Sequence, residues 1–361
     1  KAIAIEPSYA DAHNNLSTTL RELARIEEAE EHVRMASELD PCCAEYHYNA
    51  SFHLLLQGKL EEGFQLFEWR TRLKEPITSP SKSHLLWDRQ ESLEGKRFFV
   101  YAEQGLGDII QFSRYLSALE ERGALVTFQV SSKLHALLRS MDNKVKLTEV
   151  APDDHEIDFE SPLMSLPYLL NTDLATIPAS SAYLSVDADE ISKCDKRLKR
   201  DSFKIGICWQ GRKSKVDAGR SFPLSRFESL AKIPNVELIS LHKGEGESQI
   251  DSINFELTTF GPEFDAGRDA FLDTAAVMMR CDLIISSDTA IVHLAGALGC
   301  PTWVALKYVP DWRWMLRTEA TPWYPSLRLY RQSKRDDWTS VFAQMRKDLI
   351  HLLDVKGSGF E

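Results

Sequence analysis

One stretch of this chain restricts its fold more than any other: an apolar run followed at once by a polar turn and a helix. The run is Leu283-Ile284-Ile285, the turn is Ser287-Asp288-Thr289, and the segment ends at Gly299-Cys300-Pro301. A short apolar run bounded by turn residues predicts a strand that is buried on both faces, as in a parallel sheet. Asp288 or Thr289 can cap the helix that follows, and glycine then proline ends it. The stretch therefore predicts part of an open α/β sheet.

A turn of this kind can bind a phosphorylated ligand, because the N-terminus of the helix offers N–H groups to an anion. His293 lies on the first turns of the same helix, where it could reach that ligand. A capped helix with a core-facing histidine is the alternative, and the residues alone leave both interpretations open.

Strand and helix signals alternate in two successive runs. The first run predicts strands at 97–101, 125–130 and 145–150, with helices at 108–122 and 133–141. The second predicts strands at 204–209, 236–241, 283–286 and 302–306, with helices at 224–231, 271–279, 290–298 and 338–353. A charged stretch near 187–202 is interpreted as the linker between them. Two such runs predict two Rossmann-like domains that face each other across a cleft.

The first 75 residues follow a different pattern, typical of tetratricopeptide (TPR) repeats. Pro7 and Pro41 are 34 residues apart, which is the TPR period. Small residues then fall where the two helices of a repeat cross and larger apolar residues where neighbouring repeats pack: Leu16, Leu20, Ala29, Val33 and Ala36 in one repeat, and Ala50, Leu54, Gly63 and Phe67 in the next. Because two repeats rarely stand alone, we expect these to end a longer array. The array could bind a partner in its groove or serve as a spacer.

Composition excludes several classes of protein. The net charge of −11 argues against nonspecific nucleic-acid binding, and no apolar run is long enough for a transmembrane helix. Six cysteines without a Cys-x-x-Cys pair suggest reduced thiols and a cytoplasmic protein. The ten histidines form no cluster with metal-ligand spacing, so we expect no bound metal. The acidic excess of the N-terminal region is interpreted as a solvated helical surface.

A second glycine-bearing turn, Gly105-Leu106-Gly107-Asp108, follows the first predicted strand. It fails as a dinucleotide fingerprint because Ile110 stands at the third glycine position, which disfavours a dehydrogenase. The glycines permit close approach of a ligand, and Asp108 at the helix start is either a catalytic carboxylate or an N-cap.

These motifs resemble those of GT-B glycosyltransferases related to the ADP-heptose:lipopolysaccharide heptosyltransferases. The resemblance rests on the 287–301 block, in which Ala290 replaces the family's glycine, and on the Gly105–Asp108 turn. The segment Pro310-Asp311-Trp312-Arg313-Trp314 is similar to the bacterial branch in which TPR repeats precede the transferase. The implied fold is α/β GT-B preceded by all-α TPR repeats, with repeats at 1–75, an acceptor-side domain at 84–186 and a nucleotide-sugar-binding domain at 203–355.

The resemblance also implies roles for individual residues. Asp108 would be the general base of an inverting, metal-independent sugar transfer, with Glu103 as the runner-up. The acceptor side would include Glu103, Gln104, Gly105 and Gly107. The donor side would include Gln210, Arg220, Ser221, Lys243, Asp288, Thr289 and His293. Arg212, Lys213 and Lys215 make the loop after the strand at 204–209 basic, which suits a phosphate but also a solvated surface.

The resemblance therefore predicts an enzyme that moves a sugar from a nucleotide-sugar to a protein or peptide hydroxyl held in the TPR groove, without a cofactor. A lipopolysaccharide or other glycan acceptor is the alternative within the same class. A TPR scaffold that binds nucleotide without turnover is the alternative from another class. Tryptophans near the carboxyl end, among them Trp303, Trp312 and Trp323, are interpreted as structural anchors, with Asp311 and Arg313 as further candidates for the site.

Overall fold

The computed structural model divides into two compact units, each built around its own parallel sheet. It describes residues 1–79, 81–178, 182–194, 198–199, 201–212, 219–267 and 271–358. The first unit consists of Lys1–Ser131, Asn143–Ala179 and Val309–Thr318. The second consists of Ser132–Asp142, Ser180–Tyr308 and Glu319–Glu361. The first unit thus takes in a short segment from late in the sequence.

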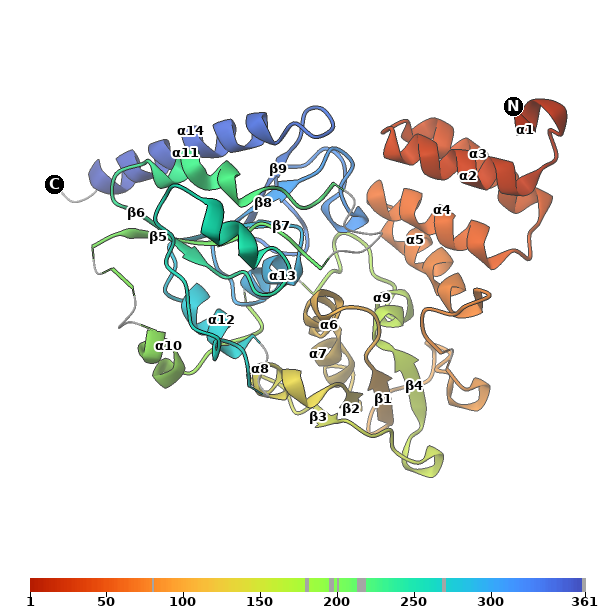
Figure 1. Cartoon of the computed structure of the whole chain (residues 1–361). Helices are drawn as coiled ribbons and strands as arrows, with labels where there is room; N and C mark the ends of the chain where they lie inside the picture. The colour runs from red at the N-terminus through yellow and green to blue at the C-terminus, as the bar shows by residue number, and fades with distance from the viewer. Residues whose placement is uncertain are drawn as a thin grey trace. The chain divides into compact units, whose positions relative to one another are not determined.

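Helical hairpins open the first unit (Figure 1). Small buried residues such as Ala29 and Ala36, both 0% exposed, let α2 and α3 pack closely. In the next hairpin a Cβ on Gly63 would lie 2.7 Å from the Leu55 side chain, so only glycine fits that crossing. This all-α region is consistent with TPR-like helices. Its elements are α1 (Ala2–Ile5), α2 (Ala10–Glu22), α3 (Ile26–Leu39), α4 (Ala44–Leu56), α5 (Leu60–Phe67) and the 3₁₀ turns Glu68–Arg72 and Ser83–Leu85.

The sheet of the first unit has four parallel strands in the order β3-β2-β1-β4. Phe98 on β1 pairs with Val126 on one side and with Phe159 on the other, which buries the centre of the sheet. Its strands are β1 (Arg97–Tyr101), β2 (Leu125–Gln129), β3 (Lys146–Thr148) and β4 (Phe159–Pro162). Its helical elements are α6 (Leu106–Phe112), α7 (Arg114–Glu120), α9 (Leu166–Leu169) and the 3₁₀ turns Asp154–Glu156, Leu163–Ser165 and η10 (Trp312–Trp314).

The sheet of the second unit has five parallel strands in the order β6-β5-β7-β8-β9. Its strands are β5 (Phe203–Cys208), β6 (Val236–Ser240), β7 (Leu283–Ser287), β8 (Thr302–Leu306) and β9 (Leu327–Arg331). Its helices are α8 (His135–Leu138), α10 (Ala188–Cys194), α11 (Glu228–Ala231), α12 (Leu272–Met278), α13 (Ala290–Ala297) and α14 (Trp338–Ser358). Its 3₁₀ turns are Ser132–Leu134, Leu224–Phe227 and Glu247–Ser252.

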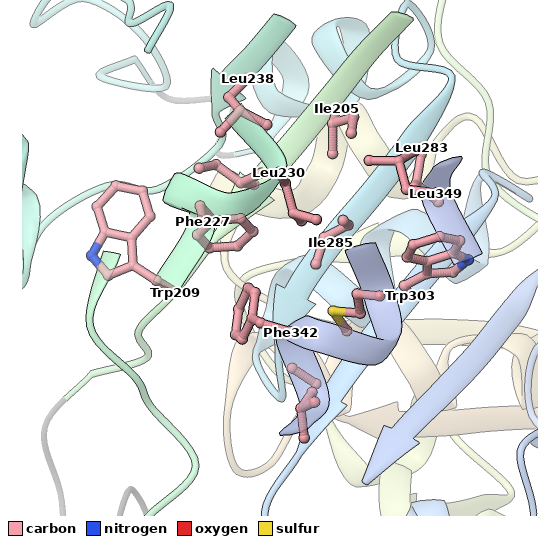
Figure 2. Close-up of a cluster of buried hydrophobic side chains, with 14 of the residues drawn as sticks. Ile205, Trp209, Phe227, Leu230, Leu238, Leu283, Ile285, Trp303, Phe342 and Leu349 are labelled. Atoms are coloured by element: carbon pink, nitrogen blue, oxygen red, sulfur yellow. The ribbon is translucent and has the colours of Figure 1, made fainter. Parts of the chain in front are cut away.

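One hydrophobic cluster holds the second sheet to α11 and α14. Ile205 and Ile285 point from neighbouring strands toward Phe227 and Phe342, as Figure 2 shows. The rings of Phe227 and Phe342 lie 5.1 Å apart in an edge-on arrangement, the geometry that aromatic pairs prefer. This core fixes the strand ends on which the predicted donor residues lie.

Several predicted elements differ from the structure. The helix expected at 108–122 begins at Leu106 and divides at Ser113 into α6 and α7. The stretch 187–202, interpreted as an irregular linker, contains α10. Two strands, β4 and β9, had no counterpart in the prediction, because Glu160 and Ser161 interrupt the first and Arg328 and Arg331 flank the apolar residues of the second.

None of the described helices combines the length and the apolar composition that crossing a bilayer requires. Within the described residues, histidine, cysteine and carboxylate side chains form no group of three or more that could hold a metal ion.

Candidate functional site

The two predicted motifs lie at the carboxyl ends of strands where each sheet changes its winding direction. In the first unit β1 lies between β2 and β4, and the Gly105–Asp108 turn follows β1. In the second unit β5 lies between β6 and β7, and Gln210 follows β5 while Asp288 follows β7. Open α/β sheets bind ligands at such switch points, because consecutive loops there diverge to opposite faces of the sheet. Each unit therefore has predicted residues at its own switch point.

Asp108 is the third residue of α6, not its N-cap. Gly105 occupies the cap position, and its backbone N–H donates to Asp108 Oδ2 at 2.9 Å. The residue before it, Gln104, has a left-handed backbone with φ of 61°, a strained conformation for a residue other than glycine. The cap alternative for Asp108 is thus corrected to a carboxylate that closes the turn from inside the helix.

The other oxygen of Asp108 accepts from Arg313, which lies in the segment 309–318 of the same unit. Arg313 Nε also donates to Gln111 Oε1 at 2.6 Å, and Nη1 donates to Asp311 Oδ1 at 2.8 Å. The side chain of Arg313 is 8% exposed, whereas that of Asp108 is 21% exposed. Asp108 is therefore held in place while part of its carboxylate stays accessible.

Glu103, the runner-up base, is committed to a buried ion pair. Arg70 donates through Nε to one carboxylate oxygen at 3.0 Å and through Nη2 to the other at 2.7 Å, and the Met164 N–H adds a bond at 2.8 Å. The two charged side chains are 0% and 1% exposed. A carboxylate buried to this degree is out of reach of a substrate hydroxyl, whereas the Asp108 side chain is partly exposed, so burial favours Asp108 as the candidate base.

In the second unit, the two ends of the loop after β5 come together. The Gly211 N–H donates to Ser221 Oγ at 3.2 Å, and a Cβ on Gly211 would lie 2.6 Å from the Arg220 guanidinium. Gln210 accepts from Gln249, and its buried side-chain Nε2 has no hydrogen-bond partner among the described residues. Gln210, Arg220 and Ser221 thus lie close together, and their role toward a donor remains a prediction. Lys213 and Lys215 lie outside the described residues.

Cys208 and His242 meet at the ends of β5 and β6. His242 Nε2 donates to the Glu245 carbonyl at 2.8 Å, so its Nδ1 is the unprotonated nitrogen that faces Cys208 Sγ at 3.5 Å. The imidazole stacks on Trp209 with 4.1 Å between ring centroids. Burial lowers the pKa of His242 and raises the pKa of the Cys208 thiol, so both groups are neutral at pH 7.

The residue at the cap position of α13 makes no side-chain capping bond within the described part of the chain. Thr289 occupies the cap position, yet its hydroxyl lies 3.3 Å from Ser286 Oγ and accepts no bond from the helix. Asp288 precedes it and is partly buried. Ser287 Oγ is fully buried and has no hydrogen-bond partner within the described part of the chain. Uncapped helix N–H groups beside an unsatisfied hydroxyl suit an anionic ligand.

His293 and Lys243 have different surroundings. His293 is 5% exposed, and its Nδ1 lies 3.0 Å from the Tyr324 hydroxyl, so the core-facing alternative describes its surroundings. A Cβ on Gly296 would lie 2.3 Å from the Tyr324 ring, which shows how closely that ring approaches α13. Lys243 is exposed and donates to the Phe264 carbonyl. Their roles toward a donor remain predictions.

Three residues that contact the predicted ones had little signal in the sequence. Arg70 follows Phe67-Glu68-Trp69 in a helical region, and only a charge inside an apolar stretch could have drawn attention to it. Gln111 and Cys208 carry no motif at all, because their importance comes from partners distant in sequence.

No protein-family model matches this chain. Among curated proteins, Protein FlbA of Caulobacter vibrioides is 25% identical over 378 residues, which cover 96% of this chain and 62% of FlbA. The chain thus spans less than two thirds of the length of that relative.

Solved structures show the fold. The glycosyl transferase family 9 protein of Veillonella parvula has a TM-score of 0.52 and 14% identity, covering 72% of this chain and 92% of its own. The E. coli ADP-heptose lps heptosyltransferase II has a TM-score of 0.51 and 14% identity, covering 72% of this chain and 99% of its own. The chain therefore has the mixed α/β, parallel-sheet fold of GT-B glycosyltransferases.

Proposed function

We propose that this protein is a glycosyltransferase that moves a sugar from a nucleotide-sugar to an acceptor hydroxyl, with inversion and without a metal. The observation that carries the proposal is the position of both predicted motifs at the switch points of two parallel sheets, in a fold whose solved neighbours are glycosyltransferases. FlbA has no activity in its name, so the proposal rests on the fold and the residues.

On the donor side, the leaving group is a nucleoside diphosphate, and negative charge grows on it as the sugar–phosphate bond breaks. The uncapped N-terminus of α13, the unsatisfied hydroxyl of Ser287 and the guanidinium of Arg220 offer donors and positive charge to that group. Such fixed donors stabilise the transition state more than the ground state when they point to where charge develops.

On the acceptor side, Asp108 takes the proton of the hydroxyl as its oxygen attacks the anomeric carbon. Each carboxylate oxygen can accept two hydrogen bonds. Gly105 donates one to Oδ2 and Arg313 donates one to Oδ1, so each oxygen can still accept a proton or a further hydrogen bond. We propose a protein or peptide acceptor bound by the N-terminal helices acting as TPR repeats, and a cytoplasmic location.

Two alternatives to a protein acceptor and to catalysis each have one observation in their favour. The E. coli neighbour is named as a lipopolysaccharide heptosyltransferase, which favours a glycan acceptor. Ala290 in place of the family's glycine at the start of α13 favours a scaffold that binds nucleotide without turnover.

Nucleotide binding is tested first, by thermal shift with ADP-, UDP-, GDP-, dTDP- and CMP-sugars and the free nucleotides. We expect one base to raise the melting temperature selectively. Turnover of the selected sugar nucleotide is then compared between the wild type and Asp108→Asn, which keeps the size of the side chain. A lost general base lowers the rate about 10²–10⁴-fold and leaves nucleotide affinity unchanged.

Asp158→Asn is the matched control. Asp158 also accepts from a backbone N–H and from an arginine, Arg97, in the same unit, but it lies at the start of β4, away from the Gly105 turn. Wild-type turnover by Asp108→Asn would remove Asp108 from the mechanism. Selective nucleotide binding by a wild-type protein that turns over no donor would instead support the scaffold.

A further inference from the structure

The segment 309–318 lies between β8 and β9 in sequence but packs in the first unit. Trp312 anchors it there: its ring meets Phe64 of α5 edge-on at 5.6 Å and tilts against Phe112 of α6 at 6.4 Å. Trp312 and Trp314 are 4% and 0% exposed. The backbone that carries Arg313 is therefore fixed between the N-terminal helices and the helix that carries Asp108.

Hydrogen bonds hold the nitrogens of the Arg313 guanidinium, and its flat face lies against the Trp312 ring. Its three nitrogens donate to Gln111, Asp311 and Asp108 in different directions, and its central carbon lies 4.4 Å from the Trp312 ring. A planar group held in this way has one orientation, whereas a lysine ammonium could satisfy only part of the set. One nitrogen of a rigid group thus defines where Asp108 Oδ1 lies.

Asp108 is held from two sides as a consequence. The Gly105 N–H fixes Oδ2 and Arg313 fixes Oδ1, so the plane of the carboxylate cannot rotate without breaking a bond. A proton acceptor must lie within hydrogen-bond reach of the attacking hydroxyl, and small displacements of a reacting group are costly in rate.

We propose that Arg313 is a positioning residue for the sugar transfer: it orients the carboxylate of Asp108 and does not itself bind the donor. The inference rests on the proposed function, because it gives Asp108 the role of base. It also gives the tryptophan-rich segment a catalytic purpose, since Trp312 places Arg313 against the turn.

The test is a double-mutant cycle on the full chain with the sugar nucleotide selected by thermal shift. The four proteins are the wild type, Asp108→Asn, Arg313→Gln and the double variant. Release of nucleoside diphosphate is measured with water as the acceptor: the water oxygen bonds to the anomeric carbon, the bond from that carbon to phosphate oxygen breaks, and Asp108 takes the proton. Calorimetry and thermal melting of each protein measure nucleotide affinity and folding.

We expect Arg313→Gln to lower kcat on the order of 10²-fold with KM and nucleotide affinity unchanged. Arg313→Lys restores the charge but not the orientation, so we expect it to remain at least tenfold below the wild type. In the Asp108→Asn background Arg313→Gln has no further effect, because both act through the same carboxylate. Arg97→Gln, which breaks the comparable pair with Asp158, retains wild-type turnover.

Other outcomes overturn the proposal in distinguishable ways. Wild-type turnover by Arg313→Gln, with Asp108→Asn impaired, removes the positioning role and leaves the proposed function intact. Equal losses of nucleotide affinity or thermal stability in the Arg313 variants assign the residue to binding or folding. A further drop in the double variant shows that Arg313 acts independently of Asp108. Absence of turnover in the wild type overturns the function and the positioning role together.

Discussion

Two arginine–carboxylate pairs in the first unit differ in burial, and burial separates their roles. Arg70 and Glu103 are 0% and 1% exposed and joined by two hydrogen bonds, whereas Asp108 remains 21% exposed beside Arg313. A fully desolvated pair contributes little net stability but makes the loss of either partner expensive. The first pair is therefore expected to matter for stability, and the second leaves a carboxylate that solvent can reach.

Arg70→Met is expected to destabilise the protein by about 3–5 kcal/mol, because it leaves the Glu103 charge buried without a counterion. The double variant Arg70→Met/Glu103→Met removes both charges, so it should be more stable than the single variant. Urea unfolding of the three proteins measures the difference. Equal stability of the single and double variants would mean that Glu103 finds another partner or takes up a proton.

His53 is expected to make the folded protein less stable at low pH. The ring is 0% exposed, neither nitrogen has a hydrogen-bond partner among the described residues, and burial together with the nearby Arg21 lowers its pKa to about 4. In the unfolded chain the group titrates near 6.5, so protonation favours unfolding as the pH falls from about 6.5 to about 4.

The expected loss over this range is up to about 3 kcal/mol, and none of it occurs above pH 7. His53→Phe should abolish that part of the acid sensitivity, whereas His351→Phe, at an exposed position of α14, should not. Melting temperatures between pH 4 and 8 report the effect. Parallel curves for the wild type and His53→Phe would exclude the mechanism.

At the scale of elements, strands made of buried apolar runs could be predicted, whereas strands and contacts that depend on residues distant in sequence could not. The strands at 97–101 and 302–306 have the predicted bounds, because their residues are buried on both faces of a parallel sheet. By contrast, β4 contains Glu160, whose carboxylate accepts a hydrogen bond from the Lys82 N–H, far away in the sequence. No local pattern around Glu160 predicts that partner. The Arg313–Asp108 contact, across 205 residues, was invisible for the same reason.

The helix α13 carries a prediction about donor binding. If the diphosphate lies at its N-terminus, Asp288→Ala, Thr289→Ala and Arg220→Ala should each weaken nucleotide binding, by about 1 kcal/mol or more for a lost hydrogen bond or charge. Titration calorimetry with the selected nucleotide measures this. Arg226→Ala is a control in the same unit, because Arg226 lies in the 3₁₀ turn Leu224–Phe227 and bonds to Thr339 on α14. Unchanged affinity in all three variants would place the donor elsewhere.

At the scale of the whole molecule, the N-terminal helices are part of the first unit and not an appendage. Arg70 reaches Glu103 beside the Gly105 turn, and Phe64 contacts Trp312. The 34-residue repeat and the change to alternating strand and helix signals separated a helical region at 1–75 from an α/β domain at 84–186. Such local patterns cannot show that the two regions share a core, because the shared contacts come from single side chains.

Removal of residues 1–83 should therefore lower the solubility and the melting temperature of the remaining chain, since it strips Arg70 from Glu103 and bares Trp312. Removal of residues 1–8 is the control, because α1 has no buried residue and Ile5 is 85% exposed. Calorimetric melting and sedimentation of the two shortened chains distinguish the cases. A chain starting at residue 84 that melts like the full protein would show that the N-terminal helices do not stabilise the rest of the first unit.

The late position of residues 309–318 in the sequence has a consequence for biosynthesis. The carboxylate of Asp108 leaves the ribosome 205 residues before its arginine, a delay of about 10–40 s at ordinary translation rates. During that interval the nascent first unit holds Phe64 and Phe112 without the indole that covers them. Translation thus supplies the last segment of the first unit about 200 residues late, and we expect the aromatic surface left uncovered until then to be the part of the nascent chain that most needs protection from aggregation.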